Sequence, residues 1–241
     1  MSEKEMTVRV ADVTFGIRYR YNVLPAICED YVVRSLEPEF WLVATDEEIE
    51  REQQSSEDSI DPGQAESAAI QRKLGEHLLR YDAFLLHAAV IEYEGIGYAF
   101  SAKSGVGKTT HIKLWRERFG DAVHIVNGDK PIIRFEDGKV FAYGTPWCGK
   151  ERYHLNDRCE LKNVCFVERA NSNSIVSLSN QDALLRLFPQ ILLYRKGNDN
   201  LKVLERLDRF MRLESFYLLG CTPTVEAAET AYFGMNREKE V

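Results

Sequence analysis

Apolar residues recur along the chain with two different spacings, which predict a mixture of strands and helices. Short alternating or continuous apolar runs are typical of strands, whereas apolar residues three or four positions apart are typical of helices. Strands are predicted at 7–15, 17–21, 40–44, 84–93, 97–101, 122–126, 131–135, 139–143, 161–168, 175–178 and 216–221. Helices are predicted at 65–80, 109–119, 182–193 and 201–209, and a further one begins at Thr222 and Pro223. The fold class that follows is α/β with mixed sheets.

Two glycine-containing turns connect predicted strands. Glu94–Gly95 separates the first strand pair, 84–93 and 97–101, and Asp137–Gly138 separates the second, 131–135 and 139–143. A polar residue followed by glycine suits the tight turn of a hairpin, because both positions can adopt positive φ. We therefore expect a hairpin at each turn.

The segment 46–65 differs in composition from the rest of the chain. Across residues 46–66 there are nine acidic residues and one basic residue. Such a segment is typical of a solvated loop or linker, here with one acidic helical turn near 47–52, and an acidic recognition surface is the alternative. The prediction is a small N-terminal β-rich unit at 1–45, a linker at 46–65 and a main domain at 66–241.

The chain of 241 residues carries 38 acidic and 31 basic side chains, a formal charge of −7, without a cluster of Lys and Arg. This balance argues against nucleic acid as the main partner. The apolar runs are too short for a membrane span, and the N-terminus lacks the pattern of a signal peptide. Five scattered cysteines without a C-x-x-C pair favour a cytoplasmic protein. Four candidate metal ligands match no zinc spacing: Cys148, His154, Cys159 and Cys165.

The segment SAKSGVGKTTH, which begins at Ser101, nearly fits the phosphate-binding pattern G-x-x-x-x-G-K-[ST], with Ala102 in place of the first glycine. Ala102 is tolerable there if its φ is negative. A chance match in a Gly/Ser turn is the alternative, but a predicted strand before the segment and a predicted helix after it supply the context that the motif requires. A nucleotide-phosphate site is therefore predicted, formed by Ser104, Gly105, Val106, Gly107, Lys108, Thr109 and Thr110.

Several side chains are candidates for chemistry at this loop. Lys108 is expected to reach the β- and γ-phosphates, and the Thr109 hydroxyl to ligate Mg²⁺. Asp129 follows Lys108 by twenty-one residues, at the end of the next predicted strand, which favours a metal contact over a plain turn aspartate before Pro131. His87 lies in an apolar strand, where a histidine is more typical of the core than of catalysis.

The turn GTPWCGK, residues 144–150, carries a further pair of candidates. Its glycines, threonine and proline are typical of a structural loop, in which Trp147 is packed. The functional alternative is a flap that carries Trp147 and Lys150 toward a bound phosphate or substrate.

Together, these segments resemble the kinase domain of HPr kinase/phosphorylase and its short relatives, which share a phosphate-loop fold with ATP-type phosphoenolpyruvate carboxykinases. The resembling residues run from His87 through SAKSGVGKTT to NGDKP, and more loosely through GTPWCGK to LKNVCFVERA, about 85 residues in all. The segment CTPTVEAAETAY is also similar to the short relatives. A carboxykinase activity would require a Lys, His and Arg constellation that the sequence does not present.

The resemblance implies a kinase that uses ATP and Mg²⁺ to phosphorylate a hydroxyl, either a serine of a peptide or protein or a small alcohol. It implies that His87, Lys108 and Asp129 are catalytic. The family ends the strand after the loop with two adjacent acids, one a base and one near the metal, whereas this chain has Gly128–Asp129. Three readings follow: Asp129 is both the base and the metal contact, or His87 or another carboxylate is the base, or phosphoryl transfer to an acceptor is weak.

The departure at Gly128 supports a second hypothesis, a switch or scaffold protein that binds a nucleotide and transfers nothing. The regulatory and docking segments of the bifunctional family enzyme are not evident, so HPr itself is not assumed as a substrate. ATP or GTP as the nucleotide, a monomer or a homo-oligomer, and the role of the N-terminal unit are left open by the sequence.

Overall fold

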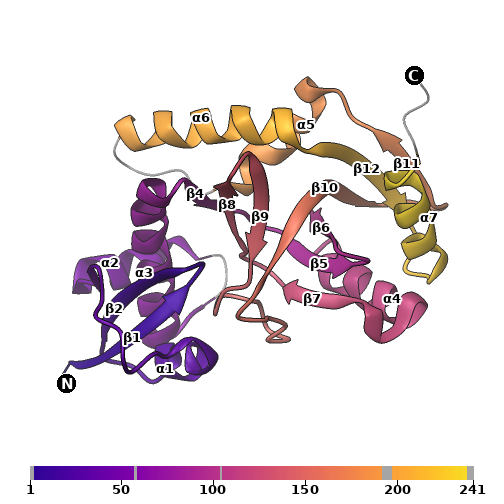
Figure 1. Cartoon of the computed structure of the whole chain (residues 1–241). Coiled ribbons are helices and arrows are strands. Elements are labelled where there is room, and N and C mark those ends of the chain that lie inside the picture. The colour runs from indigo at the N-terminus through magenta and orange to yellow at the C-terminus, as the bar shows by residue number, and fades with distance from the viewer. Residues whose placement is uncertain (1–2, 57–58, 104, 192–196, 238–241) are drawn as a thin grey trace. The chain divides into compact units, whose positions relative to one another are not determined.

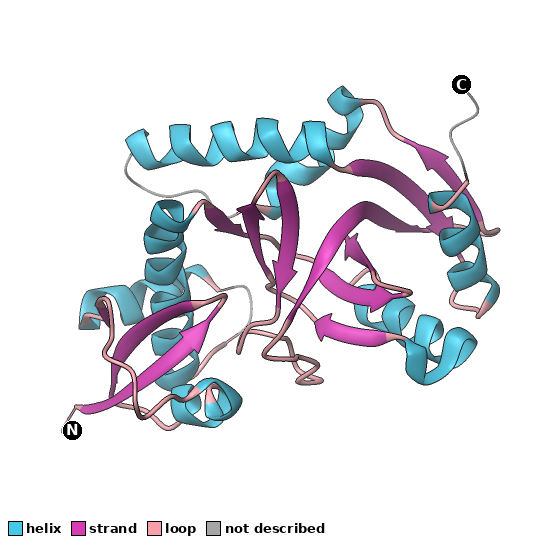
Figure 2. Cartoon of the chain, viewed as in Figure 1, coloured by secondary structure: helices cyan, strands magenta, loops and turns pink. Residues whose placement is uncertain are grey.

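The structure is a computed structural model that describes residues 3–56, 59–103, 105–191 and 197–237. The chain forms two compact units, Met1–Tyr81 and Asp82–Val241. Strands and helices occur in both units (Figure 1 and Figure 2), so the predicted α/β class with a small N-terminal unit and mixed sheets is confirmed. None of the described helices is long and apolar enough to cross a membrane.

In its described residues, the first unit has a three-stranded sheet in the order β1-β2-β3 and three α-helices. Its elements are β1 (Lys4–Val10), β2 (Val13–Tyr19), α1 (Val23–Ile27), β3 (Trp41–Val43), α2 (Asp46–Ser55) and α3 (Pro62–Leu78). The predicted strand 7–15 is in fact interrupted by a turn at Ala11 and Asp12, both of which have positive φ. This turn contains no glycine, so the sequence carried no signal for it.

The acidic segment, predicted as a linker at 46–65, is instead largely helical. Helix α2 begins with a capping box, in which the Thr45 side chain accepts from the N–H of Glu48 and the Glu48 carboxylate accepts from the N–H of Thr45. Two basic side chains of α3 pair with its acids: Arg72 with Glu52 at 2.7 Å, and Lys73 with Glu48 at 2.8 Å. The division between the units therefore falls at residue 81, after α3, and not within the acidic segment.

The second unit contains the remaining elements. Its strands are β4 (Ala83–Leu85), β5 (Ala89–Tyr93), β6 (Ile96–Ser101), β7 (His124–Asn127), β8 (Ile132–Glu136), β9 (Lys139–Tyr143), β10 (Arg158–Arg169), β11 (Ser174–Ser177) and β12 (Ser215–Cys221). Its helices are α4 (Lys108–Phe119), α5 (Asn180–Leu187), α6 (Gly197–Leu213) and α7 (Glu226–Met235). Both predicted hairpins are confirmed, with positive φ at Glu94–Gly95 and at Asp137–Gly138.

The strand that feeds the glycine-rich segment is central in the sheet. β6 is parallel to β10 and antiparallel to β5, and β10 is in turn parallel to β12. β7 pairs with β5 and not with β6, so β6 and β7 run in the same direction with β5 between them. The predicted strand–loop–helix–strand unit is therefore present, with one antiparallel strand inserted into it.

Helices cover both faces of this sheet. On one face, α4 and α7 pack through Trp115, which is fully buried and contacts the ring of Tyr98 at a tilt and the ring of Tyr232 edge to face. On the other face, Phe210 of α6 meets Phe216 of β12 in an edge-to-face contact at 5.7 Å. Since successive residues of a strand point to opposite faces, the middle parts of β10 and β12 are buried on both sides.

Replacing Asp61 with alanine is expected to lower the free energy of unfolding by about 1 kcal/mol. The Asp61 carboxylate accepts from the N–H groups of Gly63 at 2.8 Å and Gln64 at 2.9 Å at the start of α3. Urea titration followed by circular dichroism measures the change. Asp61→Asn keeps an acceptor oxygen and is the matched control. An equal loss in both variants would contradict a capping role.

Candidate functional site

The glycine-rich segment connects the end of β6 to the start of α4. Gly105 has a φ of +75° and Gly107 a φ of +128°. Residues that carry a Cβ rarely adopt such positive values. Ala102 is buried and is not among the residues with positive φ, so the missing first glycine introduces no backbone strain. Ser104, which was predicted to contact phosphate, lies outside the described residues.

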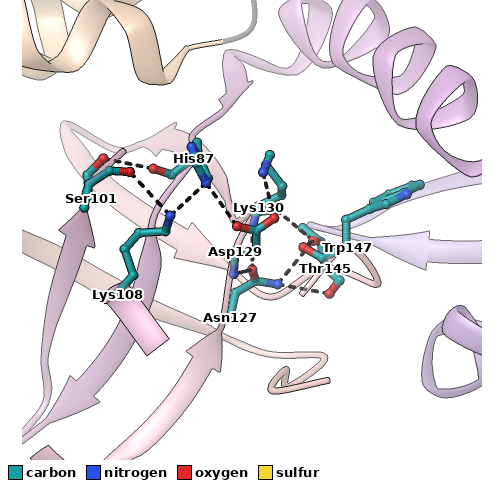
Figure 3. A network of polar contacts seen from close by, with 9 residues as sticks. His87, Ser101, Lys108, Asn127, Asp129, Lys130, Thr145 and Trp147 are labelled. Atoms are coloured by element: carbon teal, nitrogen blue, oxygen red, sulfur yellow. Dashed lines mark hydrogen bonds and ion pairs between the residues drawn. The ribbon is translucent and has the colours of Figure 1, made fainter. Parts of the chain in front are cut away.

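Lys108 is the first residue of α4, and its side chain reaches back over the loop (Figure 3). Its Nζ lies 2.8 Å from His87 Nε2 and 3.4 Å from the carbonyl oxygen of Ala102. Burial lowers the pKa of Lys108; the ammonium of Lys130 lowers it further, and the carboxylate of Asp129 opposes both. A buried ammonium next to a helix N-terminus is a group suited to binding an anion.

His87 lies in a short break between β4 and β5, whereas a continuous strand was predicted across 84–93. The N–H of the next residue, Ala88, donates to the carbonyl of Asp129 at 3.0 Å, which brings the break alongside the segment after β7. His87 Nε2 therefore lies 3.2 Å from Asp129 Oδ1. The Ser101 hydroxyl donates to the carbonyl of His87 at 2.9 Å and so ties the break to the end of β6.

Asp129 is the carboxylate of this cluster. Its burial alone would raise its pKa, but the hydrogen bond with His87 and the ammonium of Lys130, 2.7 Å from Oδ2, hold the pKa of Asp129 well below its usual range. The carboxylate is thus ionised at neutral pH. With Lys108, the cluster combines two ammonium groups, one imidazole and one carboxylate.

A buried amide fixes the backbone that carries Asp129. Asn127 is fully buried, and its Oδ1 accepts from the N–H groups of Asp129 at 2.9 Å and Lys130 at 2.8 Å. Its Nδ2 donates to the carbonyl and the hydroxyl of Thr145 at 3.0 and 3.2 Å (Figure 3). The Thr145 hydroxyl in turn donates to the carbonyl of Lys130 at 2.7 Å. The turn after β7 is therefore held from both sides.

Gly128 has a steric reason to be glycine. A Cβ at this position would lie 2.5 Å from the carbonyl oxygen of Cys148, and 3.4 Å from that of Tyr153. The N–H of Gly128 also donates to the Tyr153 carbonyl at 2.8 Å. The second acid that the family resemblance places before Asp129 has no room here, because the segments that follow β9 pack against the backbone.

Three of the predicted site residues come together: His87, Lys108 and Asp129. Trp147 lies near them through its backbone, since its carbonyl accepts from the N–H of Lys130 at 3.1 Å. Lys150 is exposed, and no contact among the described residues joins it to this cluster. Lys130, Asn127 and Thr145 were not singled out from the sequence.

The rest of the loop is held from the side of β10. The guanidinium of Arg169 donates to the carbonyls of Gly105 at 2.8 Å and Val106 at 3.3 Å, a contact that no sequence signal indicated. Thr109 is partly buried in the first turn of α4, and Thr110 is exposed. In the described part of the chain, no three His, Cys, Asp or Glu side chains are placed to hold a metal ion.

Gly128→Ala is expected to destabilise the second unit by about 1–3 kcal/mol, because the added methyl overlaps a backbone oxygen that cannot rotate away. Thermal or urea unfolding measures the change. Gly220→Ala is the matched control, since its nearest neighbours are side-chain atoms, at 3.2 and 3.5 Å. Wild-type stability in Gly128→Ala would show that the segment at Cys148 is not held against this position.

A distant likeness to a solved structure accompanies this geometry. The chain is similar to the HPr(Ser) kinase/phosphatase from Coxiella burnetii, with 13% sequence identity and a TM-score of 0.31, over 54% of this chain and 96% of that one. No protein-family model matches the sequence, and no curated protein does. The likeness is one of distant fold alone, and it carries no argument about substrate or site residues.

Proposed function

We propose that this protein transfers the γ-phosphoryl group of ATP, with Mg²⁺, to a hydroxyl acceptor. The proposal is supported mainly by the position of His87 Nε2, which lies 2.8 Å from Lys108 Nζ and 3.2 Å from Asp129 Oδ1. Lys108 directly follows the glycine-rich loop. A serine of a peptide or protein and a small alcohol both present the required hydroxyl.

The charge of the cluster supports an anionic substrate. Phosphoryl transfer is catalysed mainly by positioning and by neutralising charge on the phosphate oxygens. Lys108 and Lys130 supply two cations against the single carboxylate of Asp129, and the first turn of α4 adds backbone N–H groups. This positive surplus would offset part of the negative charge of a triphosphate.

The imidazole of His87 can serve only one neighbour at a time. Its Nε2 either accepts from Lys108 or carries a proton and donates to Asp129, since one nitrogen cannot do both. When phosphate draws Lys108 away, Nε2 is free to bond with the carboxylate. His87 then donates to Asp129 and orients its carboxylate.

In the proposed step, the phosphoryl group passes directly from ATP to the acceptor. The acceptor oxygen forms a bond to the γ-phosphorus as the bond from that phosphorus to the β,γ-bridging oxygen breaks, and ADP leaves. The acceptor proton passes to the carboxylate of Asp129. Lys108 holds the phosphate oxygens throughout.

Magnesium fits the residues as an ion that arrives with the nucleotide. Mg²⁺ is commonly held by one or two carboxylates together with substrate phosphates and water, so it needs no dedicated protein cage. Asp129 and the Thr109 hydroxyl would hold it here. The bound ion would offset the negative charge of the triphosphate.

The lack of space for an acidic side chain at Gly128 favours one alternative, a nucleotide-binding switch or scaffold that transfers no phosphoryl group. In that case Asp129 would serve the metal alone and no carboxylate would be left as a base. A switch binds nucleotide with negligible turnover, whereas a kinase releases ADP only when an acceptor is present.

Lys108→Ala is expected to reduce acceptor-dependent transfer by at least about 10²-fold, because a charge that stabilises the transferring phosphoryl group is lost. His87→Gln and Asp129→Asn are expected to reduce it by about 10²–10⁴-fold. The assay follows γ-labelled ATP with Mg²⁺ and candidate peptides, proteins and alcohols.

Lys113→Ala is the matched control for Lys108→Ala, since Lys113 is an exposed lysine of the same helix that pairs with Glu151. Its transfer rate is expected to equal that of the wild type. Full activity in Lys108→Ala would contradict the proposal. Nucleotide binding that requires Lys108, without ADP release for any acceptor, would favour the switch.

A further inference from the structure

The two glycines of the phosphate loop are not fixed in place by packing. Apart from atoms of the adjacent residues, a Cβ at Gly105 would find nothing within 4 Å, and a Cβ at Gly107 would find a carbon of Thr110 at 3.9 Å. Both glycines have positive φ, and glycine adopts positive and negative values about equally readily. Packing therefore does not determine which way the peptide groups of the loop point, and hydrogen bonds must do so.

One side chain bonds to two consecutive peptide groups of this loop. Arg169 Nη2 donates to the carbonyl of Gly105 at 2.8 Å, and Arg169 Nε donates to the carbonyl of Val106 at 3.3 Å. The planar guanidinium presents its donors in a fixed fork. The two carbonyls are therefore both turned toward the end of β10.

The N–H groups of the same peptides point the other way, because the C=O and the N–H of a trans peptide are opposed. The Gly105 carbonyl shares its peptide with the N–H of Val106, which donates within the loop to the carbonyl of Lys103 at 3.2 Å. The Val106 carbonyl shares its peptide with the N–H of Gly107, which donates to no group in the described part of the chain. Arg169 thus leaves one loop N–H directed away from β10 and available to a ligand.

The sheet fixes the backbone of Arg169. Arg169 ends β10 in register with Cys221 of β12, and the N–H of Ala170 donates to the Cys221 carbonyl at 3.0 Å. Successive residues of a strand point to opposite faces, so Glu168 lies on the other face, where it pairs with Arg186 of α5. Because β6 and β10 are parallel, Arg169 and the start of the loop lie at the same edge of the sheet.

We propose that Arg169 is a positioning residue for nucleotide binding, which holds the carbonyls of Gly105 and Val106 so that the N–H of Gly107 faces the phosphates. The inference rests on the proposed function, because that function assigns the loop to phosphate. Backbone N–H groups that face one concave side bind anions. Without Arg169, the bound phosphate itself would have to order the loop, and this ordering lowers affinity.

The fork geometry separates this role from a simple contribution of charge. Lysine would keep a positive charge beside the loop, but its ammonium is a point charge without a planar pair of donors. Arg169→Lys is therefore expected to bind a nucleotide nearly as weakly as Arg169→Gln does.

Calorimetric titration of the full chain with MgATP and with magnesium tripolyphosphate tests the role. Arg169→Gln is expected to weaken the binding of both probes by about tenfold or more, since both present phosphates to the loop. The melting temperature of the ligand-free protein is expected to stay within about 2 °C, because Arg169 is exposed. Arg186→Gln is the matched control: it removes an arginine that pairs with the neighbouring Glu168, and neither affinity should change.

The amide of Gly107 supplies a spectroscopic measurement of the loop itself. In ¹H–¹⁵N spectra of the ligand-free protein, its resonance is expected to be sharp in the wild type and in Arg186→Gln. In Arg169→Gln the same resonance is expected to be displaced or broadened, since its peptide group has lost the bond that orients it. An unchanged Gly107 resonance in Arg169→Gln would contradict the positioning role.

Three binding results would overturn the inference and leave the proposed function intact. The first is wild-type affinity for both probes in Arg169→Gln while Lys108→Ala loses it. The second is wild-type affinity in Arg169→Lys, which would assign the effect to charge. The third is a loss for MgATP alone, which would place Arg169 at the nucleoside. A wild-type protein that binds neither probe would overturn both proposals.

Discussion

The geometry of the site depends on the amide of Asn127. Its oxygen accepts two backbone N–H groups of the turn after β7, and its nitrogen donates twice to Thr145, so all of its partners are protein atoms. A buried amide with all its bonds made holds a turn more firmly than the turn's own backbone can. The carboxylate of Asp129 therefore has a defined position before any ligand arrives, and His87 is aligned against it.

The cluster is assembled from three places that are distant in sequence. His87 comes from a break between strands, Lys108 from the start of α4, and Asp129 from the end of β7. Because β5 is inserted between β6 and β7, the loop and the aspartate do not sit on neighbouring strands. The break at His87, just before β5, spans that gap and joins Lys108 to the carboxylate of Asp129, which Lys130 contacts directly. The insertion of β5 therefore places His87 between Lys108 and Asp129.

Sequence patterns predicted the elements that are determined by residues close together in the sequence. The loop, its flanking strand and helix, and both glycine-containing hairpins follow from neighbouring residues. Only one turn of α2, near 47–52, was predicted. Its capping box at Thr45 and Glu48 is a local signal, whereas the pairing of its acids with Arg72 and Lys73 appears only in the folded chain. Asn127 and Thr145 were missed because they are eighteen residues apart and meet only in the folded chain.

Close approach of backbones is likewise invisible in a sequence. In the sequence, Gly128 stands where the family resemblance places an acidic residue. The structure shows that the carbonyl of Cys148 leaves no space for a side chain at this position. Such glycines are required by packing that only tertiary structure reveals. The predicted residues His87, Lys108 and Asp129 do meet.

The cluster is already saturated with internal partners in the free protein. His87 Nε2 pairs with either Lys108 or Asp129, and Asp129 is also paired with Lys130. A ligand must therefore exchange these contacts for its own, and its net affinity is the difference between the two sets. A singly or doubly charged anion gains little from such an exchange, whereas a ligand with several adjacent charges can replace all the contacts at once. Pre-pairing of this kind would favour ligands that carry several adjacent charges over small anions.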